Sequence, residues 1–235
     1  MEEKIMPFAA HLRELRNRLL VCMFTVLVLS VLGYYLYFPI IKFLSSPFGE
    51  TLYARHITEG FVTRLNVAFF TGLTLSIPVI VASVLGFVFP ALDGKNRKIL
   101  TAGVAAGGML FLAGAVFAYK LILPSAIAIL KSASFIPEGV ARQFLFQDSV
   151  KFAFQFLLAF GAAFQLPVVL VALMAAGVVK RKTITKHFRI AVVICFIVAA
   201  VLTPPDVLSQ LMLAVPLVAL YGLSILAGVM FKLGE

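Results

Sequence analysis

One carboxylate lies in a basic helical segment near the start of the chain. Glu14 is flanked by Arg13 and Arg16, and Arg18 follows four residues after it. Glu and Arg at this spacing on a helix form an ion pair worth roughly 0.2–0.5 kcal/mol. A carboxylate is also the group that accepts the forked donors of an incoming guanidinium, so Glu14 is equally a candidate contact for an arginine-bearing ligand. The sequence leaves both interpretations open.

A second polar side chain, Gln165, lies in the middle of a long uncharged stretch. Its amide needs a hydrogen-bond partner if the surroundings are lipid. One interpretation is a bond that holds helices of the same chain together, and the other is a polar contact offered to a partner helix. Gln155 is expected to be structural.

Signatures of catalysis are missing from the sequence. It contains neither an H-E-x-x-H motif nor a G-x-S-x-G nucleophile elbow, and the long apolar stretches hold no Asp or Glu. Cys22 and Cys195 lie in apolar stretches, where we expect small buried hydrophobes instead of a disulfide or metal ligands. We therefore predict that the protein is not an enzyme and has no catalytic residues, cofactor or metal site.

Long apolar helices must position these side chains. Hydrophobic residues make up 62% of the chain and charged residues 13%, against ~25% charged in soluble domains. We predict one all-α membrane domain over residues 1–235, because a membrane-spanning helix needs about 20 apolar residues. The six predicted transmembrane helices cover about 19–41, 65–92, 99–119, 152–179, 190–204 and 207–231. The fifth is short and should thin the bilayer locally or sit behind its neighbours.

The basic residues predict the orientation in the membrane. Net charge is +10, and most of the 20 Lys and Arg residues fall in segments 1–18, 93–98, 180–189 and 232–235. Such residues are retained in the cytoplasm, so both termini are predicted to be cytoplasmic and the charge does not indicate nucleic-acid binding. Residues 1–18 are predicted to form an amphipathic helix along the inner surface of the membrane.

Several motifs of the chain resemble one known family. Residues 11–19, His-Leu-Arg-Glu-Leu-Arg-Asn-Arg-Leu, resemble the signature H-L-x-E-L-R-x-R-L of TatC, the multispanning component of the twin-arginine protein translocase. Further matches follow in order and cover nearly the full length: Thr58-Glu59-Gly60-Phe61, Phe87 with Pro90-Ala91-Leu92, Phe160-Gly161 with Phe164 and Leu166-Pro167, and Leu202-Thr203-Pro204-Pro205-Asp206 with Ser209-Gln210.

The resemblance implies a concave, cup-like bundle of six helices in the bacterial cytoplasmic membrane. It implies recognition of twin-arginine signal peptides at the cytoplasmic surface. It also implies an oligomeric complex with the single-span proteins TatA and TatB, which exports folded proteins using the proton-motive force. The signal-peptide site is expected to include Leu12, Arg13, Glu14, Arg16 and Asn96. A partner-helix contact is expected at Gln165, Pro167 and Gln210, and a periplasmic cap at Glu59, Pro204, Pro205 and Asp206.

Three positions differ from the acids usual in that family. Asn96 stands in place of a second cytoplasmic Glu, Gln165 in place of an intramembrane Glu, and Gly222 in place of a Glu in the last span. Asn accepts a hydrogen bond from Arg without supplying charge, and Gln does not titrate. The alternative function is a small-solute transporter or channel. That function would need a polar path at mid-membrane, where the sequence offers Gln165 and a few hydroxyls.

Overall fold

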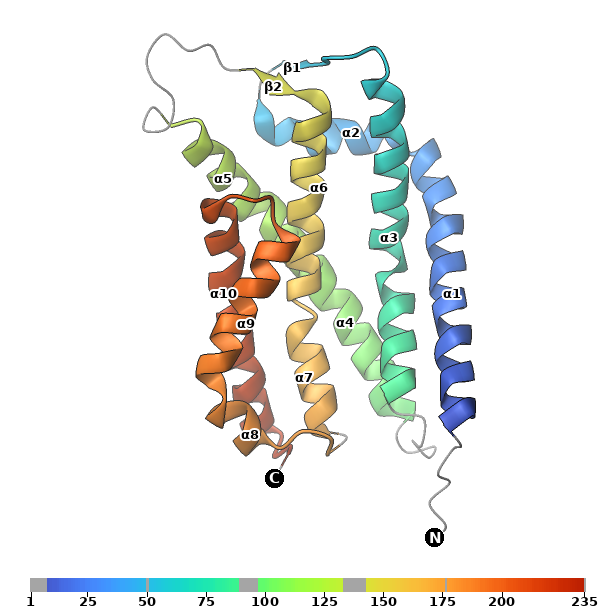
Figure 1. Cartoon of the computed structure of the whole chain (residues 1–235), viewed down its shortest axis with the longest axis vertical. Coiled ribbons are helices and arrows are strands. Elements are labelled where there is room, and N and C mark those ends of the chain that lie inside the picture. The colour runs from blue at the N-terminus through green and yellow to red at the C-terminus, as the bar shows by residue number, and fades with distance from the viewer. Residues whose placement is uncertain (1–7, 50, 89–96, 133–142, 176, 235) are drawn as a thin grey trace.

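The computed structural model describes residues 8–49, 51–88, 97–132, 143–175 and 177–234, and over these residues the chain is almost entirely helical (Figure 1). Within the described part of the chain, five helices are long and apolar enough to cross a membrane: Leu12–Tyr35, Glu59–Phe87, Gly103–Leu130, Phe146–Ala175 and Val207–Met230. A sixth apolar helix, Phe188–Leu202, is shorter. Lipid is the natural surrounding, because large apolar side chains such as Phe24 and Val201 are 70% and 78% exposed.

The first helix, α1 (Phe8–Tyr35), is longer than the predicted span 19–41 at its start. Residues 8–18 are not a separate surface helix, because no glycine or proline interrupts the chain before Gly33 and the helix continues without a break. The helix ends at Leu36, whose backbone (φ −85°, ψ 13°) turns the chain into α2 (Tyr37–Ser45). A single 3-10 turn, η1 (Ser46–Phe48), then leads to Gly49, whose φ of 64° reverses the chain direction.

The third helix, α3 (Glu59–Val88), packs along α1 (Figure 1). It begins before the predicted residue 65, and residues 89–92 of the predicted span lie outside the described residues. Glycines set the close approach of the two helices, since a β-carbon at Gly33 would lie 2.8 Å from the carbonyl oxygen of Ala68. Small residues at such crossings let helix backbones pack tightly in lipid.

The next long helix has three parts. The α-helix α4 (Arg97–Phe117) continues through a π-helical turn, η2 (Ala118–Ile122), into α5 (Leu123–Leu130), and together they run obliquely behind the other helices (Figure 1). Pro124 lies in the first turn of α5 and has no N–H to donate. The wider turn of η2, closed by the Leu123 N–H on the Ala118 carbonyl, keeps the helix continuous.

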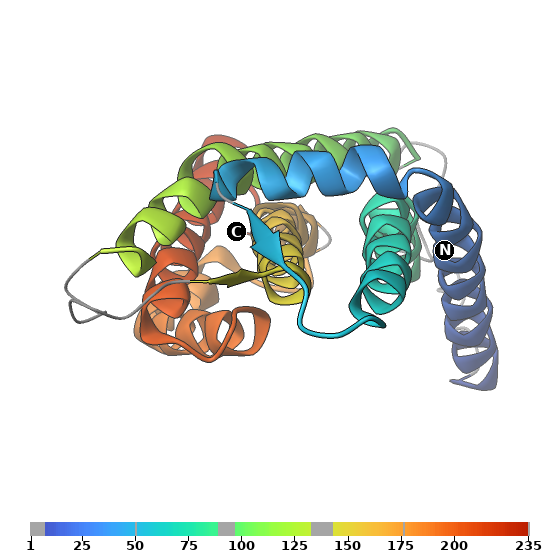
Figure 2. The same cartoon turned by 90° about the horizontal axis from the view of Figure 1, so that it is seen from above.

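A central helix, α6 (Phe146–Ala163), separates two apolar cores. One contains Phe156 and Phe160 packed with Ala199 and Leu213, and the other contains Val150. Figure 2 shows α6 (yellow) in the middle of the bundle, with α3 on one side and the last two helices on the other. The helix is interrupted after α6 and resumes as α7 (Leu166–Ala175), whose second residue is Pro167.

The last helices form a short hairpin. A six-residue helix, α8 (Arg181–Lys186), precedes α9 (Phe188–Leu202) and α10 (Val207–Met230). The 15 residues of α9 give ~22 Å of helix, less than the ~30 Å of a hydrocarbon core. The start of α1 and the end of α10 lie at the same end of the bundle, which we call the basal end; the hairpin stops short of the opposite, distal end (Figure 1).

The described residues contain one small β ladder. The strands β1 (Leu52–Tyr53) and β2 (Phe144–Leu145) pair in parallel at the distal end, with Leu52 opposite Phe144. The ladder joins the connection before α3 to the connection before α6.

Candidate functional site

Glu14 lies at the basal end of α1 and is paired with Arg18. The Arg18 guanidinium donates two hydrogen bonds to one oxygen, Oε1, from Nε at 2.9 Å and from Nη2 at 2.5 Å. Within the described part of the chain, no donor reaches the other oxygen, Oε2. The Glu14 side chain is 24% exposed. The ion pair that the spacing predicts is therefore formed, and it leaves half of the carboxylate open to a ligand.

Arg18 also links α1 to α3. Its Nη1 donates a hydrogen bond to the carbonyl oxygen of Ser83 at 3.2 Å. Gly86, three residues further along α3, provides the space, because a β-carbon there would collide with Nη1 and lie 3.0 Å from Cζ. Neither Ser83 nor Gly86 was identified from the sequence. The available signal was a glycine inside an apolar helix, which marks close approach of a neighbouring group.

The other residues predicted for this site lie on the same first turns of α1. Leu12 is 49% exposed, and Arg13 and Arg16 are also exposed. Asn96 lies outside the described residues, as does the loop from 93 to 96. The structure thus places Leu12, Arg13, Glu14 and Arg16 together on one helix end.

Gln165 lies at the break between α6 and α7. Its Nε2 donates a hydrogen bond to the Gly107 carbonyl oxygen on α4 at 2.8 Å, so the predicted bond between helices is present. Its Oε1 is buried and accepts no hydrogen bond from the described residues. Pro167 has no N–H and cannot donate to the carbonyl oxygen of Ala163, four residues earlier at the end of α6. The helix therefore breaks between α6 and α7.

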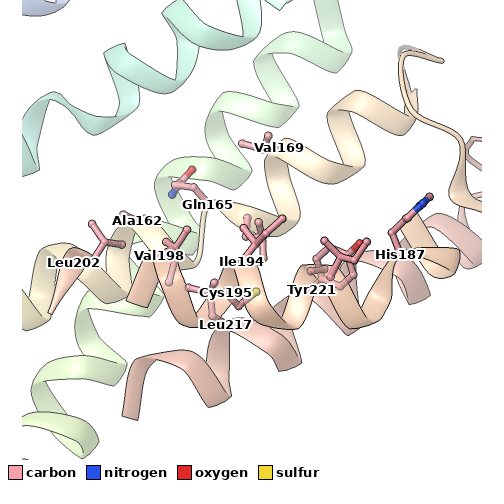
Figure 3. Close-up of a pocket in the computed structure, with 14 residues that line it drawn as sticks. Ala162, Gln165, Val169, His187, Ile194, Cys195, Val198, Leu202, Leu217 and Tyr221 are labelled. Atoms are coloured by element: carbon pink, nitrogen blue, oxygen red, sulfur yellow. The ribbon is translucent and has the colours of Figure 1, made fainter. Parts of the chain in front are cut away.

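An apolar groove borders Gln165, and Figure 3 shows the side chains that line it. Its volume is about 480 Å³. The walls come from the α6–α7 junction, α9 and α10, and include Val169, Ile194, Cys195 and Leu217. Gln210, the third residue predicted for a partner contact, lies on α10, where its Nε2 donates to the Phe196 carbonyl of α9 at 3.1 Å. Gln165 and Pro167 therefore share one junction, and Gln210 ties the hairpin together.

The residues predicted for a cap occupy two separate places. Glu59 lies in the first turn of α3 at the distal end and is 7% exposed, with a buried Oε2 that has no partner in the described part of the chain. Pro204, Pro205 and Asp206 form the tip of the α9–α10 hairpin. Asp206 caps α10, since its Oδ1 accepts from the Ser209 N–H at 2.7 Å. The tip of the α9–α10 hairpin lies below the upper end of α3 (Figure 1).

Comparison with known proteins identifies the family. The model of the family "Sec-independent protein translocase protein (TatC)" matches residues 10–216. The chain belongs to the TatC family. It is 36% identical over 216 residues to the TatC protein of Helicobacter pylori, covering 92% of this chain and 85% of that one. It is 33% identical over 229 residues to the TatC protein of Escherichia coli, covering 95% and 88%.

The fold is also similar to a solved TatC structure. A crystal structure described as the twin-arginine translocase receptor TatC superposes with a TM-score of 0.83 at 29% identity, covering 94% of this chain and 98% of that one. The resemblance predicted from the sequence motifs is confirmed. This TatC family member is a subunit of a Sec-independent protein translocase and a multi-pass protein of the bacterial cytoplasmic membrane.

Titratable side chains of this TatC protein do not form a metal centre in the described residues, where no three His, Cys, Asp or Glu side chains come together. Cys22 and Cys195 are free thiols on α1 and α9. Three of the side chains predicted from the sequence keep an oxygen without a hydrogen-bond partner in the described residues: Glu14 at the basal end, Gln165 within the bundle and Glu59 at the distal end.

Proposed function

We propose that this TatC protein binds twin-arginine signal peptides at the cytoplasmic surface through the carboxylate of Glu14. The supporting observation is the free Oε2 of Glu14, held at an exposed end of α1 among basic residues. Guanidinium groups are always charged and bind carboxylate oxygens in a directional fork geometry. Glu14 therefore contributes a contact for one arginine of the pair.

The remaining contacts of the proposed site come from neighbouring residues. Leu12 offers an exposed apolar surface to the peptide, while Arg13 and Arg16 line the approach on the same helix end. We assign the second arginine to Asn96 and its loop, where an amide oxygen would accept a hydrogen bond without adding charge.

The proposed topology has six spans, with α9 as the fifth, in a concave cup whose basal end faces the cytoplasm. The shared position of the start of α1 and the end of α10 supports an even number of crossings. The basic residues of α8 and its flanks, Lys180, Lys182, Lys186 and Arg189, are exposed at the basal end, in keeping with retention of positive charge in the cytoplasm.

Partner proteins complete the proposed activity. We assign TatA- and TatB-type single-span helices to the groove beside Gln165, whose apolar walls from the α6–α7 junction, α9 and α10 offer a packing surface to a partner helix. Pro167 interrupts the helix beside the groove. Gln210 holds α10 against α9 through its hydrogen bond to the Phe196 carbonyl oxygen. On the proposed periplasmic side, Glu59 shapes the distal end of α3, and Pro204, Pro205 and Asp206 shape the shorter tip of the α9–α10 hairpin. The oligomeric complex then exports folded proteins using the proton-motive force.

Peptide binding tests the proposal directly. Purified full-length protein in nanodiscs is titrated with a labelled twin-arginine signal peptide and with the same peptide carrying two lysines. Glu14→Gln removes the charge but keeps the size of the side chain, and we expect it to weaken twin-arginine binding by about tenfold, the loss of one charged hydrogen-bonded contact. Twin-lysine binding should change much less.

A matched acid-to-amide control is Asp148→Asn, because Asp148 is an exposed acid in the first turn of α6 at the distal end. It should leave both affinities unchanged. Equal loss of both peptides in Glu14→Gln, or no loss of either, would refute a specific role for Glu14.

A further inference from the structure

Arg18 has the same chemistry as the ligand proposed for Glu14. Its guanidinium already places both Nε and Nη2 on Oε1 of that carboxylate. An incoming arginine that approaches Glu14 therefore meets one free oxygen and one occupied oxygen. A forked, two-oxygen contact requires that Arg18 first leaves.

The structure gives the Arg18 guanidinium a fitted position between two helices. A third hydrogen bond, from Nη1 to the Ser83 carbonyl oxygen, fixes the guanidinium to α3. The absence of a side chain at Gly86 makes the space for it. The Arg18 side chain is still 31% exposed, so it can leave this position for water without rearranging the helices.

We infer that Arg18 determines the preference for arginine over lysine: it is an internal competitor that an arginine of the signal peptide displaces from Glu14 and that a lysine does not. This inference rests on the proposed function. Specificity is a difference between two affinities, and a group that opposes the wrong ligand contributes to it as much as a contact with the right one.

A peptide arginine and a peptide lysine differ in how well they replace the Arg18 contacts with Glu14. A peptide guanidinium replaces the lost Arg18 contacts with equivalent N–H donors in the same planar geometry. A lysine ammonium is a compact point charge that cannot form the forked contact, and it also meets the positive charge of Arg18. The exchange is therefore nearly balanced for arginine and unfavourable for lysine.

The ratio of twin-lysine to twin-arginine dissociation constants, measured on the full-length protein in nanodiscs, tests the inference. Arg18→Gln removes the competitor and its charge. We expect the ratio to fall about fivefold or more, mainly because the twin-lysine peptide binds more tightly. Arg18→Lys keeps the charge but loses the fork and should give an intermediate ratio.

A second variant moves Arg18 without substituting any charged residue. The β-carbon of Gly86→Ala collides with the flexible tip of Arg18, so the guanidinium moves while the helices stay in place. We expect the ratio to fall in the same direction as for Arg18→Gln. Gly108→Ala is the control, because a β-carbon at Gly108 has no neighbour within 4 Å, and it should leave the ratio unchanged.

Two results would overturn the role of Arg18. One is an unchanged ratio in Arg18→Gln, and the other is weaker twin-arginine binding with the preference intact, which would mean a purely structural role. Glu14→Gln separates this failure from failure of the proposed function. If Glu14→Gln weakens twin-arginine binding while Arg18→Gln leaves the ratio unchanged, only the inference about Arg18 is wrong.

Discussion

Gly72 on α3 lies so close to Ser30 on α1 that a β-carbon at Gly72 would stand 2.6 Å from the Ser30 amide nitrogen and 2.7 Å from the Val26 carbonyl oxygen. Both atoms belong to the backbone of α1, so they cannot move aside as a side chain does. The α1–α3 contact at Gly72 is therefore set by backbone against backbone.

This relationship predicts the effect of adding one methyl group. Gly72→Ala forces α1 and α3 apart, and we expect a loss of about 1–3 kcal/mol in unfolding free energy, the usual cost of overpacking. Gly60→Ala on the same helix is the control, since its β-carbon has open space. Unfolding in mixed detergent and SDS, followed by circular dichroism, measures both; equal stability of the two variants would contradict the close contact.

Removing the amide of Gln165 should lower partner binding while leaving the free energy of unfolding nearly unchanged. Gln165→Leu loses the hydrogen bond to Gly107 but also removes the buried, unpaired Oε1, so stability should change by no more than about 1 kcal/mol. Crosslinking to a TatA- or TatB-type helix in membranes should fall several-fold. Gln155→Leu, on α6, should preserve it. Unimpaired crosslinking in Gln165→Leu would remove Gln165 from the partner contact.

Asp206 should stabilise α10 through its hydrogen bond to the Ser209 N–H. Asp206→Ala removes the cap and should cost about 1 kcal/mol, whereas Asp206→Asn keeps an acceptor and should cost much less. Hydrogen exchange at residues 207–210 is the measurement, because the first turn of α10 would open more often in the alanine variant. Identical exchange in the two variants would show that the cap contributes nothing.

Arg64 on α3 is enclosed by aromatic rings from the α1–α2 corner. Its Cζ lies 4.1 Å from the centre of the Tyr34 ring and 5.4 Å from that of Tyr37, and its Nη2 donates to the Tyr34 carbonyl oxygen at 3.4 Å. A double-mutant cycle with Arg64→Met and Tyr34→Leu should give a coupling free energy of about 0.5–2 kcal/mol, typical of a cation–π contact. A coupling within error of zero would mean that the arrangement is packing alone.

The sequence predicts the long apolar helices well, because lipid requires about 20 uncharged residues for each. It does not fix the residue at which α1 gives way to α2, but it does hold a local signal for this break: Pro39 has no N–H to donate to the Tyr35 carbonyl, just as Pro167 has none for the end of α6. The strands β1 and β2 were missed for a different reason. Two-residue strands are too short to show an alternating pattern, and their pairing depends on where the helices put them.

The candidate site was predictable only along one helix. The pairing of Glu14 with Arg18 follows from their spacing of four residues on α1. The contact of Arg18 with Ser83 joins two helices, and which residues meet there depends on how α1 and α3 are aligned along each other. No local pattern in the sequence determines that alignment. Gln165 shows the same division: its need for a partner was evident, but the identity of Gly107 as that partner was not.

The parallel pairing of β1 with β2 has a consequence for biosynthesis. β1 precedes α3 and β2 follows α5, so β1 has no partner until the ribosome has made everything through α5. The helices α1 and α3 can meet in the membrane long before that point. The ladder at the distal end can therefore form only after the α1–α3 pair, and a nascent chain arrested before residue 144 would hold a paired α1–α3 unit with an unpaired β1 strand that a chaperone or protease could bind.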